Sequence, residues 1–143
     1  MLARTLATFA VTLLLLLVGC NSGHEGLIPV SGTVTFDGAA PPKSGMVQFL
    51  PLETPPGGIQ RTAFGQFNAD GQYSATSFSP GDGLYPGKYE VRVVCNKPQS
   101  GSSKADSLQR DSHVAEGYEG TELVVEAGAD EITLDLDVPL NKS

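Results

Sequence analysis

The chain has 143 residues and a formal net charge of −7 at pH 7, with seventeen glycines, ten prolines and no tryptophan. The acidic balance argues against nucleic acid as a partner, because Lys and Arg side chains that neutralise phosphates supply most of the affinity in such complexes. The glycine and proline content favours turns over helices, and the length suits a single domain.

The first nineteen residues are typical of a cleaved secretory signal. Arg4 supplies a positive start, an apolar run follows from Leu6 to Val18, and Gly19 is a small residue at its end. The run is shorter than the roughly 20 residues that a membrane-spanning helix needs. We therefore expect residues 1–19 to be removed, which changes the formal charge of the remaining chain to −8 because Arg4 is lost.

The segment from Leu17 to Cys20 resembles the lipobox of bacterial lipoproteins. The resemblance implies cleavage between Gly19 and Cys20 and attachment of acyl chains to Cys20, which becomes the first residue. Two or three acyl chains give a lasting anchor, whereas one anchors only marginally. The alternative is an ordinary signal peptide with a chance cysteine after it. We expect residues 20–28 to form a tether, and the chain to be held at the cell membrane or outer membrane on the non-cytoplasmic side.

Seven segments have the period-two alternation or the composition of β-strands: residues 30–36, 46–50, 62–67, 72–76, 89–95, 121–126 and 131–138. No segment of the remaining chain has the period of an amphipathic helix. The pattern predicts an all-β fold, a single seven-stranded antiparallel β-sandwich over residues 29–140 with a short tail at 141–143.

Turn signals lie between these segments. The structural turn residues that we assign are Gly38, Asp70, Gly71, Pro86 and Gly87. A type I turn over residues 68–71 requires a glycine at positive φ, so we expect Gly71 to be hard to replace. A calcium site at Asp70 is the alternative, but a calcium loop needs about six oxygen ligands at regular spacing.

Residues 96–119 form a long segment without a sustained pattern. Loops of this length inside a compact domain tend to be functional or disordered. We expect disorder in the first half, whereas residues 113–118 carry enough apolar character to pack against the body.

Cys95 has no disulfide partner once Cys20 is lipidated. It continues the alternation of Tyr89, Val91 and Val93, which predicts that it points inward. We expect it to be a small buried hydrophobe, with a reactive or intermolecular thiol as the alternative.

Acidic residues gather near the C-terminus, where nine of them and no Lys or Arg lie from Asp111 to Asn141. In the last predicted strand, Glu131, Asp135 and Asp137 share the face opposite the apolar row. One interpretation is a solvated face that keeps an edge strand from pairing with other chains. The other is a surface that collects cations or docks a basic partner.

Three motifs together carry a resemblance to a known family. The segments Val30 to Gly38, Asp70 to Tyr73 and Pro86 to Val93 are similar, in order and spacing, to the carboxypeptidase regulatory-like domains, which are transthyretin-like, or prealbumin-like, β-sandwiches. Behind a lipobox, the chain resembles the small lipoproteins of this type in planctomycete-like bacteria. The resemblance implies an accessory sandwich without catalysis. Related hydrolases use strand histidines and a C-terminal Tyr-Arg-Gly-Ser signature, which this chain lacks.

The histidines do not suggest an active site. His24 lies in the tether, where we expect nothing to hold it, and His113 adjoins Asp111 and Ser112, whose side chains diverge from it. No zinc spacing or phosphate-binding loop occurs. We therefore predict no enzyme and no cofactor, but a structural or interaction module that binds an envelope protein or glycan. The alternative is a small-ligand or cation-binding domain that uses the acidic strand face or the 96–119 loop.

Overall fold

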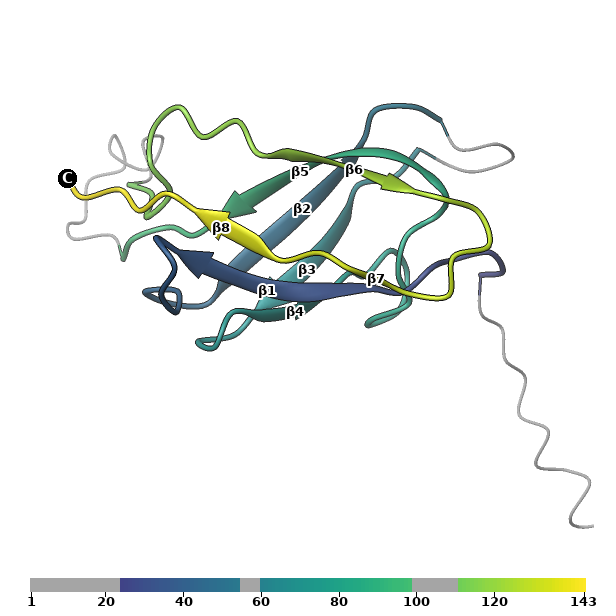
Figure 1. Ribbon diagram of the computed structural model, residues 1–143, viewed down its shortest axis with the longest axis horizontal. Coiled ribbons are helices and arrows are strands. Elements are labelled where there is room, and N and C mark those ends of the chain that lie inside the picture. Colours follow the sequence, from purple (N-terminus) through teal and green to yellow (C-terminus); the bar gives the residue numbers. More distant parts are fainter. Residues whose placement is uncertain (1–23, 55–59, 99–110) are drawn as a thin grey trace, which may run out of the picture.

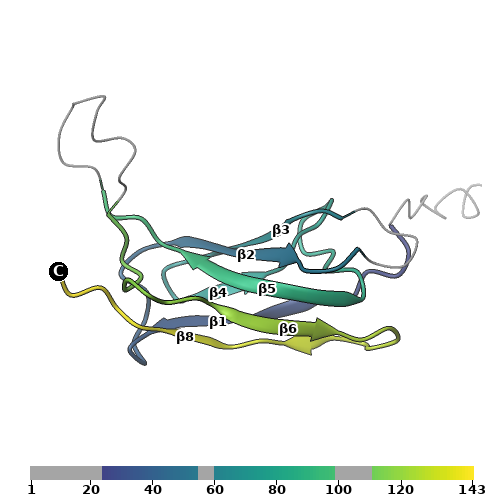
Figure 2. The same cartoon turned by 90° about the horizontal axis from the view of Figure 1, so that it is seen from above.

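The computed structural model describes residues 24–54, 60–98 and 111–143, and within them the chain is all-β, without a helix. The strands are β1 (Val30–Phe36), β2 (Gly45–Pro51), β3 (Ala63–Phe67), β4 (Gln72–Ser74), β5 (Gly87–Val94), β6 (Thr121–Val125), β7 (Ile132–Thr133) and β8 (Leu136–Val138). One sheet has the order β3-β2-β5-β6, and the other joins β4, β1, β7 and β8. Figures 1 and 2 show the two sheets as layers, an arrangement consistent with the expected β-sandwich.

The core lies between the two layers because each strand alternates inward and outward side chains. In β5, Tyr89, Val91 and Val93 are buried while Arg92 faces solvent, as the alternation predicts. Val34 of β1 is fully buried in the opposite layer. Burying an aliphatic or aromatic side chain of this kind contributes about 1.5–3 kcal/mol, so the paired apolar faces hold the layers together.

The last predicted strand is broken, so the described chain has eight strands rather than seven. Residues 131–138 divide into β7 and β8, with Leu134 and Asp135 between them. The Asp135 carboxylate accepts a hydrogen bond from the Thr33 backbone N–H at 2.9 Å. A side-chain oxygen therefore takes a place that a strand carbonyl would occupy in an unbroken ladder.

The prediction of a wholly antiparallel arrangement is also wrong. β1 runs parallel to both β7 and β8, with Val30 opposite Ile132 and Val34 opposite Leu136. The other strand pairs are antiparallel. Alternation has the same period in both arrangements, so the sequence pattern does not distinguish them.

The body begins earlier than expected. Ile28, which we assigned to the tether, is only 4% exposed and belongs to the core. Its backbone exchanges hydrogen bonds of 2.8 and 2.9 Å with that of Leu84. The C-terminal tail is also attached, because the Asn141 N–H donates to the His113 carbonyl at 2.8 Å.

The two ends of the body differ in what they carry. Figures 1 and 2 place the chain leading to β1 at one end of the long axis and the C-terminus at the other. The β4–β5 and β6–β7 connections lie at the first end, which we call the tether end. The β1–β2 and β3–β4 turns lie with the C-terminus at the far end.

Candidate functional site

The predicted cleavage and lipidation residues, Gly19 and Cys20, lie outside the described residues. Within the described ranges, no helix is long and apolar enough to cross a membrane. The candidate sites that the structure does describe are a surface hollow, an acidic strand face, two histidines and a buried thiol.

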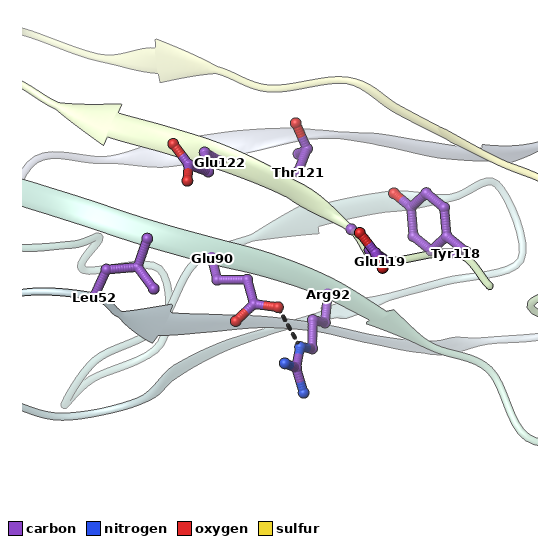
Figure 3. A pocket seen from close by; sticks show the side chains of 8 residues that line it. Leu52, Glu90, Arg92, Tyr118, Glu119, Thr121 and Glu122 are labelled. Atoms are coloured by element: carbon purple, nitrogen blue, oxygen red, sulfur yellow. Dashed lines mark hydrogen bonds and ion pairs between the residues drawn. The ribbon is translucent and has the colours of Figure 1, made fainter.

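The hollow has a volume of about 730 Å³ and lies on the outer face of the β3-β2-β5-β6 sheet (Figure 3). Glu90 and Arg92 of β5 alternate with buried residues and therefore face away from the core. The hollow is lined by Leu52, Glu90, Arg92, Tyr118, Glu119, Gly120, Thr121 and Glu122. Residues far apart in sequence thus form one shallow surface.

Charged groups dominate this hollow. Arg92 Nε donates to Glu90 Oε1 at 2.7 Å, and this hydrogen bond and the opposite charge raise the pKa of Arg92. The lining has three carboxylates and one guanidinium, so it favours cationic groups. Burial, with a smaller effect from Asp137, raises the pKa of Tyr118, which keeps its hydroxyl neutral. The lining has no histidine, cysteine or lysine, and its side-chain hydroxyls belong to Tyr118 and Thr121.

The acidic strand face is partly used by the fold. Asp137 Oδ1 accepts hydrogen bonds from the Gly38 N–H at 2.9 Å and from Thr35 Oγ1 at 2.8 Å. These bonds lower the pKa of Asp137. Asp135 is bonded to β1 in the same way, through Thr33. In the described part of the chain, no group of three or more His, Cys, Asp or Glu side chains could hold a metal ion.

The Asp37-Gly38 turn reverses the chain after β1. Both residues have positive φ, 49° for Asp37 and 78° for Gly38. Phe36 and Ala39 exchange backbone hydrogen bonds of 2.8 and 3.0 Å across them. Gly38 therefore lies in a two-residue hairpin turn, the kind that favours glycine.

The β3–β4 turn contains Asp70 and Gly71. The Gly71 N–H donates to the Asn68 carbonyl at 2.9 Å, and Gly71 has a φ of 83°. Asn68 Oδ1 accepts from the Asp70 N–H at 3.0 Å, as in an Asx turn. Of the other assigned turn residues, Pro86 precedes β5 and Gly87 is the first residue of that strand.

The expectation that nothing holds His24 is wrong. Its ring stacks on that of Phe78 with centroids 3.7 Å apart, and the Arg61 guanidinium lies 4.8 Å from the same ring centre. The pairing of Ile28 with Leu84 brings these segments together, so no local sequence signal could have predicted the contact.

His113 is held by its backbone, whose N–H donates to the Cys95 carbonyl at 2.8 Å. Burial and the nearby charges of Lys97 and Lys43 lower the pKa of His113. His24 contacts Phe78, whereas the backbone of His113 bonds to Cys95 and Asn141, so the two histidines have different surroundings.

Cys95 is fully buried, as predicted. Its Sγ lies 3.7 Å from the Lys43 carbonyl oxygen. Burial raises the pKa of the thiol despite this contact. The group therefore behaves as a small core hydrophobe in the folded chain.

The prediction that residues 113–118 pack against the body is confirmed. Val114 and Tyr118 lie against the core, and Val114 forms a bridge with Leu140. The Ala115 N–H donates to the Pro139 carbonyl at 2.9 Å. Of the segment predicted to be disordered, residues 99–110 lie outside the described ranges.

Comparisons with protein-family models, curated proteins and solved structures found no match. Sequence alternation predicted that Glu90 and Arg92 face water, but not that Tyr118 and Glu119 join them. The sequence gives no signal for these two residues, because their position depends on the path of the segment before β6 in the folded chain.

Proposed function

We propose that this chain is a lipoprotein of the bacterial cell envelope, with a non-catalytic interaction module held at the membrane by acyl chains on Cys20. The resemblance of residues 17–20 to a lipobox supports the anchor. The resemblance to carboxypeptidase regulatory-like domains, together with the two-sheet body, supports a transthyretin-like sandwich as the fold type.

The observation that carries the proposal is the pairing of Ile28 with Leu84. The body then begins only eight residues after Cys20, a stretch that spans at most about 29 Å when fully extended. Stacking of His24 on Phe78 shortens the free stretch to four residues, or about 14 Å. Acyl chains on Cys20 would therefore hold the tether end close to the membrane and leave the far end and the sheet faces for partners.

The chemistry of the described sites supports binding over catalysis. In the hollow, Arg92 is bonded to Glu90, and the buried thiol of Cys95 has a raised pKa. Asp135 and Asp137 bond to β1 rather than to each other. The proposed partner is an envelope protein or glycan.

A substitution at Cys20 tests the anchor. The full chain is expressed in a lipoprotein-processing bacterium, and the mature N-terminus is analysed by mass spectrometry after membrane fractionation. We expect the wild type to begin at an acylated Cys20 and to sediment with membranes, and Cys20→Ser to remain uncleaved and unacylated. A Cys20→Ser chain that is still cleaved before residue 20 and sediments unchanged would overturn the proposal. Cys95→Ser is the control for loss of a cysteine elsewhere.

A further inference from the structure

β6 is the one long edge strand of the described chain whose outer edge is neither interrupted nor paired. Unpaired edge strands invite pairing with other chains, and proteins usually shorten, break or cover them. β3 is paired at one end of its outer edge, because Phe64 exchanges two backbone hydrogen bonds with Thr76. β4 has three residues, and the β7–β8 edge is interrupted at Asp135. β6 has five residues and is paired with β5 alone.

The backbone groups that point from β6 to this free edge can be identified. Along an antiparallel strand, successive residues direct their N–H and C=O groups to alternate sides. The Lys88 carbonyl accepts from the Leu52 N–H, next to β2, whereas a Cβ on Gly120 would lie 2.2 Å from the Val91 carbonyl oxygen. Odd-numbered residues of β5 therefore face β6.

Those β5 residues define the partners in β6. Val91 lies opposite Thr121 and Tyr89 opposite Leu123, so Thr121 and Leu123 exchange hydrogen bonds with β5. The intervening residues, Glu122 and Val124, direct their N–H and C=O groups outward. None of these four groups bonds to another described residue.

The surroundings of the edge indicate the chemistry of its partner. Val124 is 56% exposed and is the most exposed large hydrophobic side chain in the described ranges. Glu119, Glu122 and Glu126, all exposed, lie along and just beyond the strand. Lys88 Nζ lies 3.6 Å from Glu122, but an ion pair this exposed contributes little, and Arg92 is already bonded to Glu90.

We propose that the free edge of β6 binds an extended basic polypeptide segment of a partner protein, which adds as a further strand. The outward groups of Glu122 and Val124 form its backbone hydrogen bonds, and alternate Lys or Arg side chains lie beside the glutamates. Strand addition takes affinity from main-chain hydrogen bonds and specificity from alternate side chains. The inference deepens the proposed function, because it names the surface and kind of partner for the interaction module.

Charge argues against a second copy of this chain as the occupant. Two β6 strands paired with each other would bring Glu119, Glu122 and Glu126 of both copies to one seam. Like charges directly across paired strands are destabilising. A basic segment has no such penalty.

The test measures fluorescence anisotropy of a labelled eight-residue peptide of alternating valine and lysine, added to the full chain in a non-ionic detergent. A valine and glutamate peptide of the same length is the control. We expect the basic peptide to bind, with an affinity that falls as salt rises, and the acidic peptide not to bind. Val124→Pro removes an outward N–H but no bond to β5, and should weaken binding at least about tenfold. Val124→Ala is the matched variant that keeps the N–H and should bind within about twofold of wild type.

A second variant distinguishes a loss of binding from a folding defect in Val124→Pro. Glu122→Lys leaves the edge intact, and should weaken the basic peptide about fivefold or more and admit the acidic one. Equal binding of both peptides by wild type, or unchanged binding by Val124→Pro, overturns the inference. A wild-type dimer in sedimentation that Val124→Pro dissociates overturns it in favour of a second copy. Because the assay contains no bilayer, failure here is distinct from failure of the Cys20→Ser fractionation.

Discussion

The hydroxyl of Tyr73 in β4 donates a hydrogen bond of 2.6 Å to the carbonyl of Leu134, at the break between β7 and β8. It passes over Gly32 of β1, where a Cβ would lie 1.8 Å from the same carbonyl oxygen. Because Gly32 has no side chain, the Tyr73 hydroxyl can reach across β1 and donate to the Leu134 carbonyl between β7 and β8.

Tyr73→Phe should lower the free energy of unfolding by about 1–2 kcal/mol at neutral pH, because the Leu134 carbonyl loses its donor. Burial, together with the charge of Asp135, raises the pKa of Tyr73. Its contribution is therefore fully present below about pH 10, the ordinary value for tyrosine, and is lost as the pH rises above it. Denaturant unfolding between neutral and alkaline pH should show a shallower alkaline loss in Tyr73→Phe than in the control Tyr85→Phe. Equal alkaline slopes would contradict this.

Gly71→Ala should destabilise the chain by more than about 3 kcal/mol, because a positive φ and a clash act together. A Cβ at Gly71 would lie 2.1 Å from the Val34 carbonyl oxygen, beside the Val34 N–H that donates to Gly71 at 2.8 Å. Gly117 has nearly the same φ, 82°, and open space around its Cα. Gly117→Ala should therefore cost only the backbone strain of about 1–2 kcal/mol. Similar thermal melting temperatures for the two variants would show that the contact with Val34 is unimportant.

Asp82→Asn should reduce stability by about 1–2 kcal/mol, because a carboxylate that accepts several backbone bonds becomes an amide. Asp82 accepts from the N–H groups of Ser77, Phe78 and Ser79 at 2.7 to 3.0 Å. Desolvation raises the pKa of Asp82, but these hydrogen bonds outweigh it and leave the pKa below the ordinary value. The stabilisation is thus present above about pH 4 and is lost as the pH falls through the lowered pKa. Acid titrations of wild type and Asp82→Asn should converge at low pH, and parallel curves would rule this out.

Millimolar calcium should leave the melting temperature of the full chain unchanged. A ligand that binds only the folded state raises its stability. Asp135 and Asp137 already accept hydrogen bonds from Thr33, Thr35 and Gly38, so they are not arranged around a cation. Differential scanning fluorimetry with calcium, and with magnesium as the control, checks this. An upward shift with calcium alone would favour the cation-binding alternative.

Cys95 should react with a maleimide only when the chain unfolds. Its side chain is fully buried, and burial raises the pKa of the thiol, which reduces the reactive thiolate. Mass spectrometry of the full chain, labelled with and without denaturant, gives the two rates. We expect native labelling to be slower by at least a hundredfold, about 3 kcal/mol of protection. Comparable rates would point to an accessible thiol instead.

Much of the local structure follows from the sequence alone. The alternation around Val91 correctly predicts which side of β5 faces the core, since side-chain direction depends only on position within a strand. The β3–β4 turn is equally local, because the Gly71 N–H donates to the Asn68 carbonyl and the Asn68 N–H donates to the Gln72 carbonyl. The outward direction of Glu90 and Arg92 also follows from the local alternation along β5.

Only the tertiary structure decides which strands meet and in which direction. The bond from Thr33 to Asp135 joins residues 102 apart, and that from Tyr73 to Leu134 joins residues 61 apart. A period of two is unchanged by the direction of the neighbouring strand, so it predicts neither the parallel pairing of β1 nor the break at Asp135. The hollow and the free edge of β6 arise in the same way. Both depend on backbone partners that are distant in sequence, and alternation does not encode those partners.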